Sequence, residues 1–138
     1  MKTVFVDTDI MLDYFLERED FYLNSLNLMN AAATGKIKLL TSSVTITILI
    51  YFLGKKFSSK EMQQKLRILR TFVEIGNCGS SEVDEMIISN FSDLEDGLQH
   101  SVALNNGAEV FITRNKKDYK HSIIPVMNAG EFLKTLMF

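Results

Sequence analysis

Two carboxylates, one residue apart, follow a short apolar run near the N-terminus. The run is Val4-Phe5-Val6, and Asp7 and Asp9 come next. Such a run is typical of a buried parallel strand, and ligands of open α/β sheets lie beyond the carboxyl ends of such strands. Because a charge is costly there unless it is paired or binds a metal, Asp7 is a candidate metal ligand. Asp9 precedes an apolar helical pattern and could instead cap that helix.

Two further groups of polar residues are predicted where a helix begins and where a strand ends. They are Asp93, Glu95 and Asp96 in the first turn of a helix, and Thr113, Arg114, Asn115 and Asp118 just past a strand at 110–112. If that strand lies beside the strand that ends at Asp7, all of these residues converge on one crevice. Converging carboxylates repel one another and raise at least one pKa, a conflict that a divalent cation resolves. Oxygen ligands favour Mg²⁺ or Mn²⁺. The simpler alternative is that the acids of the helix only complement its dipole.

A basic run lies beside the predicted crevice. Its members are Arg114, Lys116, Lys117 and Lys120. The run could hold phosphates next to a metal, or it could be a solvated turn. His100, one turn after Asp96, could orient a water, although a histidine at such a place more commonly packs.

Strands alternate with helices along the chain, and this alternation positions the polar groups. We predict strands at 2–6, 36–41, 73–75, 109–113 and 123–126, and helices at 9–16, 21–34, 43–53, 58–72, 80–90, 92–105 and 128–137. The helix at 92–105 would begin at a capping box opened by Ser92. This order predicts a single α/β domain over residues 1–138, a three-layer sandwich with a central parallel sheet of about four to five strands.

The segment 44–53 is ambiguous. Its β-branched residues favour a strand, but an apolar run of this length, closed by Gly54, is normal for a helix. We expect a helix capped at Ser42 or Ser43. Because it is apolar almost all round, we expect it to be buried or to form an interface, and a homodimer is the natural candidate.

Composition narrows the class of protein. The chain has 138 residues, a net charge of −2 and one cysteine, Cys78. It therefore carries no global basic field for nucleic acid and no internal disulfide, which makes a reducing, cytoplasmic location the expectation. Cys78, His100 and His121 match no zinc-ligand spacing. No signal peptide is evident, and no apolar stretch is long enough to span a bilayer.

Four motifs, in order, resemble those of PIN-domain proteins. They are Asp7-Thr8-Asp9-Ile10-Met11-Leu12-Asp13, the segment 93–99, the segment 107–115 with Asp118-Tyr119, and Pro125-Val126 with the closing helix. The resemblance covers essentially the whole chain and implies a parallel sheet between helices. Characterised members are often metal-dependent ribonucleases, and many small bacterial ones are toxins of the VapC type, neutralised by a cognate antitoxin. The resemblance thus implies RNA and an antitoxin as partners.

Carried over by motif, Asp7 and Asp96 would be the principal metal ligands, for Mg²⁺ or Mn²⁺, and Asp93 and Asp118 would assist them. The metal would activate a water for attack on an RNA phosphodiester. RNA contacts would come from the polar turn, that is, from Arg114, Asn115, Lys116 and Lys117.

Two positions depart from the family pattern. Ile48 stands where catalytic members carry a glutamate, and Asn115 stands where an aspartate is common. Two formal charges are therefore missing, and metal affinity should drop. Either the remaining acids suffice for one ion, or the chain is a catalytically degenerate module that acts through a protein partner or RNA. A third alternative is a haloacid-dehalogenase-type phosphatase, since Asp7 and Asp9 also resemble the aspartate pair of that family.

Overall fold

A computed structural model describes residues 1–137 of the chain, and its centre is a five-stranded, all-parallel sheet. The strands are β1 (Lys2–Val6), β2 (Ile37–Ser42), β3 (Val73–Gly76), β4 (Val110–Ile112) and β5 (Val126–Met127), in the spatial order β3-β2-β1-β4-β5. The predicted parallel α/β sheet of four to five strands is confirmed.

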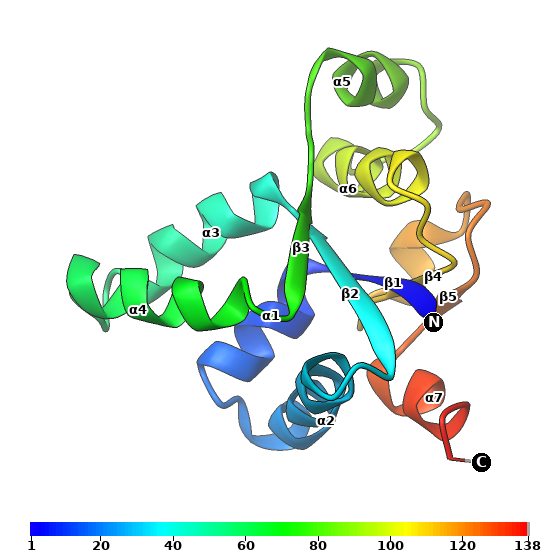
Figure 1. Cartoon of the computed structure of the whole chain (residues 1–138). Helices are drawn as coiled ribbons and strands as arrows, with labels where there is room; N and C mark the ends of the chain where they lie inside the picture. Colours follow the sequence, from blue (N-terminus) through cyan, green and yellow to red (C-terminus); the bar gives the residue numbers. More distant parts are fainter. Residues whose placement is uncertain (138) are drawn as a thin grey trace.

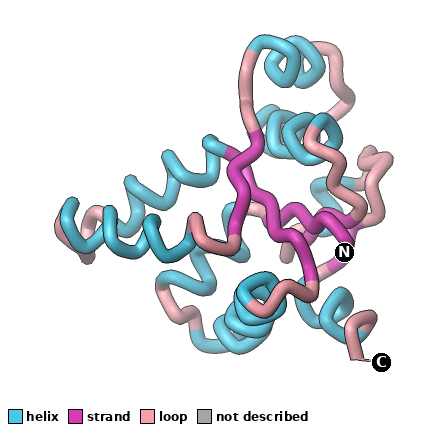
Figure 2. Tube along the Cα trace, viewed as in Figure 1, coloured by secondary structure: helices cyan, strands magenta, loops and turns pink. Residues whose placement is uncertain are grey.

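Helices cover both faces of the sheet, which makes three layers (Figure 1). They are α1 (Thr8–Phe15), α2 (Tyr22–Ala33), α3 (Ser43–Leu53), α4 (Ser59–Leu69), α5 (Ser80–Ile87), α6 (Leu94–Asn105) and α7 (Ala129–Lys134), with short 3₁₀ turns η1 (Glu19–Phe21) and η2 (Lys116–Tyr119). In Figure 2 the magenta strands run between α5 and α6 above and α2 and α7 below, while α3 and α4 project to one side. Within residues 1–137 no helix has the length and apolar character needed to cross a membrane.

The core has one part on each face of the sheet because alternate strand residues point to opposite faces. Val4 and Val6 belong to the larger apolar cluster, which includes residues of α1, α2 and α7. Phe5 belongs to the cluster under α6 and stacks on Phe111, with ring centres 4.9 Å apart. These strand residues are fully buried, so the end of β1 is rigidly placed.

β1 and β4 lie side by side where the direction of the chain across the sheet reverses. The chain runs outward from β1 through β2 to β3, and then returns to β4 on the other side of β1. Val6 is in register with Ile112, and the amide of Asp7 donates to the Ile112 carbonyl at 2.9 Å. The ends of these two strands form the topological switch point at which open α/β sheets bind ligands.

The ambiguous segment at 44–53 is helical, as expected. Ser42 caps α3, and its hydroxyl accepts a hydrogen bond from the amide of Thr45 at 3.2 Å. One face of the helix is buried through Leu49 and Leu53. The β-branched residues of this segment are therefore helical, although their local propensity favours a strand. Tertiary packing overrides that propensity here.

Two predicted helix caps and one strand differ from the structure. Asp93, not Ser92, caps α6, and Asp7, rather than Asp9, caps α1. The last strand is confined to Val126–Met127 instead of beginning at 123. Pro125 precedes it and has no N–H to donate, although its carbonyl accepts from the amide of Phe111 at 2.9 Å.

Candidate active site

Asp7 lies at the centre of the switch point, with its side chain 7% exposed. Its Oδ1 accepts hydrogen bonds from the Thr8 amide at 2.8 Å and from Gln99 Nε2 at 3.4 Å. Its Oδ2 accepts from the Thr113 hydroxyl at 3.0 Å and from the Tyr119 hydroxyl at 2.9 Å. The carboxylate that ends β1 is thus held by residues from α6, from the end of β4 and from η2.

Tyr119 connects Asp7 to Asp96. Its hydroxyl also lies 3.1 Å from Asp96 Oδ1, so the two candidate ligands that the sequence predicted contact one phenol. A phenol has one proton and donates to one carboxylate at a time. Burial and the two carboxylates raise the pKa of Tyr119, so the phenol stays protonated.

Asp96 and Asp7 both resist ionisation. Burial is the main cause that raises the pKa of Asp96 to about 7, and the charges of Asp93, Asp7 and Asp118 raise it further against the hydrogen bond from Tyr119. Burial likewise raises the pKa of Asp7. A pair of carboxylates in this state gains from a proton or from a cation.

Asp9 places a third carboxylate beside this pair. Its Oδ2 accepts from the backbone N–H of Arg114 at 2.9 Å and lies 3.4 Å from the Thr113 hydroxyl. Its Oδ1 is buried and has no hydrogen-bond partner within the described chain. Burial, followed by the charge of Asp7, raises the pKa of Asp9 to about 6. Asp9 therefore carries a buried oxygen that is available to a proton or a cation.

Asp93 and Asp118 lie at the edge of the site. Both are exposed, and Asp93 accepts from the amides of Glu95 at 3.0 Å and Asp96 at 3.4 Å as the cap of α6. Asp93 thus caps α6, whereas the simpler alternative from the sequence was that the acids of this helix only complement its dipole. The charges of both residues still act on Asp96, because both raise its pKa.

The donor set fits one hydrated divalent cation better than a fully enclosed metal. Across residues 1–137, no three His, Cys, Asp or Glu side chains are grouped so that they could hold a metal ion. Mg²⁺, however, keeps several waters and is commonly bound by one or two carboxylates. Asp7 and Asp96 share one hydroxyl, and Asp9 offers an oxygen without a partner. All of these donors are oxygens, which suits Mg²⁺ or Mn²⁺.

An uncharged network covers the side of Asp7 that faces α3. The Thr8 hydroxyl lies 2.9 Å from the Thr45 hydroxyl, and Gln99 Nε2 donates to Thr45 at 2.8 Å while Gln99 Oε1 accepts from Ser42. Ile48, one turn after Thr45, is partly buried and packs against the apolar core. The charge that the family pattern places on this helix is therefore absent.

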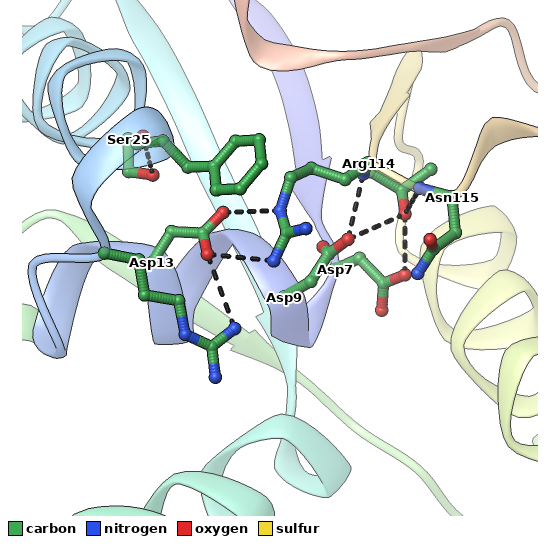
Figure 3. Close-up of polar contacts among 9 residues, drawn as sticks. Asp7, Asp9, Asp13, Ser25, Arg114 and Asn115 are labelled. Carbon is green, nitrogen blue, oxygen red and sulfur yellow. Dashed lines mark hydrogen bonds and ion pairs between the residues drawn. The ribbon is translucent and has the colours of Figure 1, made fainter.

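Two of the four basic residues of the polar turn, Arg114 and Lys116, form ion pairs within the protein, and Figure 3 shows the pair of Arg114 with Asp13. Arg114 Nε lies 2.8 Å from Asp13 Oδ2 and Arg114 Nη2 lies 3.0 Å from Asp13 Oδ1, so the pair is bidentate. Lys116 Nζ lies 2.8 Å from Glu131 Oε1. Asn115 and Lys117 are exposed. Of the four predicted RNA contacts, two thus have their charge paired inside the chain.

Several site residues escaped the sequence analysis. Gln99 and Asp13 carried a detectable signal, since each lies three or four residues after a predicted site residue and so shares its helix face. Tyr119 stood in a quoted motif beside Asp118 but received no role, because a buried aromatic residue is usually part of a core. His100 lies between Phe91 and Phe111, at 5.1 and 6.5 Å between ring centres, and burial lowers its pKa, as the packing interpretation predicts.

Comparison with known proteins gives the same family over nearly the full length. A family model described as PIN domain matches residues 3–117. The chain is 32% identical over 136 residues to Ribonuclease VapC1 of Aquifex aeolicus (strain VF5), a match that covers 95% of this chain and 93% of that protein.

Solved structures share the fold at lower identity. The crystal structure of VapBC2 from Rickettsia felis bound to a DNA fragment from their promoter matches with a TM-score of 0.63 and 23% identity, over 91% of this chain and 98% of that chain. A toxin–antitoxin complex from Klebsiella pneumoniae matches with a TM-score of 0.66 and 20% identity, over 91% and 97% of the two chains. With five carboxylates at the β1–β4 switch point and its edge and a family match over most of its length, the chain belongs to the PIN-domain family rather than to the phosphatases that share its Asp7–Asp9 spacing.

Proposed function

We propose that this chain is a metal-dependent ribonuclease and the toxin of a toxin–antitoxin pair. The observation that carries the proposal is the placement of Asp7 and Asp96 on one Tyr119 hydroxyl, at the switch point of the sheet. Its 32% identity to Ribonuclease VapC1 of Aquifex aeolicus supports RNA as the substrate. Structural likeness to toxin–antitoxin complexes is consistent with an antitoxin partner.

Asp7 and Asp96 would hold Mg²⁺ or Mn²⁺, with the unpaired oxygen of Asp9 beside them. When bound, such an ion supplies activation of a water and stabilisation of the charge that develops on the phosphodiester. Thr113 and Tyr119 orient Asp7 by donating to its Oδ2. Asp93 and Asp118 add negative charge near Asp96, which favours a cation there. Asn115 and Lys117, which are exposed next to the site, would contact the RNA backbone.

The exposed surface of α3 is the candidate interface for a second copy of the chain. Ile50 and Tyr51 on α3 are large apolar residues whose exposed fractions are 52% and 64%. We include a homodimer through α3 in the proposal, since a dimer is the commonest closed assembly. A cytoplasmic location is part of the same proposal, because it keeps the lone Cys78 reduced.

Cleavage of a fluorescent single-stranded RNA tests the function. With Mg²⁺ or Mn²⁺ present, we expect Asp7→Asn and Asp96→Asn to lower the rate at least about 100-fold, the scale of losing one group that stabilises transition-state charge. Asp84→Asn, an exposed aspartate on α5, is the matched control and should cleave like the parent protein. Cleavage that persists in EDTA, or in both site variants, would contradict the proposal.

A catalytically degenerate binding module is the second candidate, and Ile48 is the observation that favours it. Ile48 leaves the α3 side of the site without a charge, which weakens metal binding. Calorimetry with Mn²⁺ separates the two candidates. Binding that depends on Asp7 supports the ribonuclease, whereas no binding at millimolar Mn²⁺ supports the module.

A further inference from the structure

A pocket of about 380 Å³ lies next to the carboxylates, between α1, α2 and the start of α7. Its volume is in the range of sites that bind small organic groups, about 300–1,000 Å³. Arg114 and Asn115 form one wall, and the backbone N–H of Arg114 also donates to Asp9 at 2.9 Å. In Figure 3, Asp7 and Asp9 lie on one side of the Arg114 backbone, and Asp13 and Ser25 lie beyond its guanidinium. Arg114 thus lies between the acidic site and the pocket and contacts both.

The charges of the pocket do not suit a phosphate. Among the described residues that line it, the one cation is the Arg114 guanidinium, which is bound at two points by the fully buried Asp13. Asp20 adds a further negative charge to the lining. A phosphate in this pocket would therefore find no net positive charge to bind it, whereas an uncharged polar group would not be repelled.

The pocket combines a flat surface with carboxamides. The Phe21 side chain is 41% exposed, and Arg114 Cζ lies 4.0 Å from the centre of its ring. Because Asp13 holds the guanidinium at two points, its position over the Phe21 ring is fixed. Asn24, Asn115 and Asn128 line the same pocket, and each carboxamide carries both donors and acceptors.

Gly130 keeps the space between two of these carboxamides open. A Cβ built on Gly130 would lie 3.3 Å from Asn24 Nδ2 and 3.5 Å from Asn128 Oδ1. The carboxamides of Asn24 and Asn128 therefore both border the space that a side chain at position 130 would fill. Asn128 Oδ1 already accepts from the amide of Glu131 at 2.8 Å, which fixes the orientation of that carboxamide.

We propose that this pocket binds one base of single-stranded RNA, beside the phosphodiester held at the carboxylates. Single-stranded bases are recognised by stacking on aromatic rings or guanidinium planes and by hydrogen bonds to their edges, and the pocket offers both next to the acidic site. The inference rests on the proposed ribonuclease function, and it makes the pocket the subsite that selects sequence. Phe21 and Arg114 provide the stacking surface, and Asn24 and Asn128 contact the edge of the base.

Binding of the four free nucleosides tests the pocket without any cleavage. We would titrate adenosine, guanosine, cytidine and uridine in EDTA and follow the protein by NMR. We expect a preferred nucleoside to bind the parent protein, and we expect Asn24→Leu and Gly130→Ala to weaken it about 10-fold, the scale of one lost base contact. Asn27→Leu is the matched control, because Asn27 is exposed one turn further along α2 and does not line the pocket. Thermal unfolding would verify that each variant is folded.

Cleavage of RNAs with each base beside the cut completes the test. We expect the parent protein to prefer one base there and Asn24→Leu to flatten that preference, with Asn27→Leu unchanged. Nucleoside binding that ignores Asn24 and Gly130, or inorganic phosphate that competes with the nucleosides, would overturn the pocket proposal. RNA cleavage with no base preference would overturn it while leaving the ribonuclease intact. Nucleoside binding in a protein that cuts no RNA would instead overturn the ribonuclease.

Discussion

The hydroxyl of Tyr119 lies 2.9 Å from Asp7 Oδ2, although the two residues are 112 positions apart in the sequence. The contact joins η2 to the end of β1 in a buried environment. The Tyr119 hydroxyl lies between the carboxylates of Asp7 and Asp96 and supplies a hydrogen-bond donor there. The chemistry of the site therefore depends on an aromatic residue as well as on the acids.

Replacing Tyr119 by phenylalanine should destabilise the metal-free protein at pH 8 by about 1–2 kcal/mol, because a buried carboxylate loses a donor. The ring and its packing against Phe111, at 4.3 Å between ring centres, would remain. Urea denaturation in EDTA measures the change in unfolding free energy. Mg²⁺ or Mn²⁺ should reduce the difference, because a cation bound by Asp7 would take the place of the lost donor as the partner of its carboxylate.

Tyr22→Phe is the control for that experiment. Tyr22 is half-buried on α2, away from the carboxylates, and its ring packs against Tyr14. It should lose less stability than Tyr119→Phe. Equal stability of Tyr119→Phe and the parent protein would show that the hydroxyl does not support Asp7.

Stability of the metal-free protein should fall as the pH rises from about 4 to 7. The folded-state pKa is about 7 for Asp96 and about 6 for Asp9, against an ordinary value of 3.8. Between these values the folded state binds more protons than the unfolded state, so raising the pH favours unfolding. Urea denaturation at several pH values in EDTA measures this slope.

Asp96→Asn should flatten the pH dependence, and millimolar Mn²⁺ should oppose it, because the ion replaces the proton. Asp96 is partly exposed, so solvent screening keeps the effect modest. A pH slope in EDTA that is the same for Asp96→Asn and the parent protein would contradict the raised pKa of Asp96.

Removing Arg114 should leave Asp13 as a buried charge with a poor partner. Arg18 Nη1 lies 3.5 Å from Asp13 Oδ1 and is the remaining cation. We expect Arg114→Ala to lower the free energy of unfolding by about 3 kcal/mol. Adding Asp13→Asn to that variant should restore part of the loss, because the unpaired charge is then gone.

Lys116→Ala is the matched control for the ion pair. Its partner is Glu131, and both side chains are 46% exposed. Breaking an exposed pair typically costs less than about 1 kcal/mol. If Arg114→Ala cost no more than Lys116→Ala, the pair with Asp13 would not be structural, and the guanidinium would be free to contact RNA.

Introducing an acid on α3 should strengthen the metal site. We expect Ile48→Glu to raise Mn²⁺ affinity in calorimetry and to speed RNA cleavage, at some cost in stability because Ile48 packs against the core. Thr47→Glu, at an exposed position of the same helix, is the control and should change neither. No gain from Ile48→Glu would show that this position is not the place of a lost ligand.

Local patterns in the sequence were sufficient for most of the fold. The run Val4–Val6 indicated a buried strand, and the long apolar segment after Ser42 indicated a helix; both are correct. The caps were less predictable. Ser92 and Asp93 are both good capping residues, and the backbone geometry that selects Asp93 arises only when α6 packs. The alternation of strands and helices also brought Asp7 and Asp96 to one site in prediction, because neighbouring parallel strands end at one edge.

Only the tertiary structure decided which side chains complete that site. Gln99, Thr113 and Tyr119 contact Asp7 from segments 92 to 112 residues away, and these contacts form only when the chain has folded. Arg114 was predicted to face RNA, but the packing of α1 places Asp13 within its reach. Sequence by itself determined where the carboxylates lie along the strands and helices, since this follows from local periodicity. Long-range packing determined which donors and cations surround them, and therefore how much charge remains for a metal and RNA.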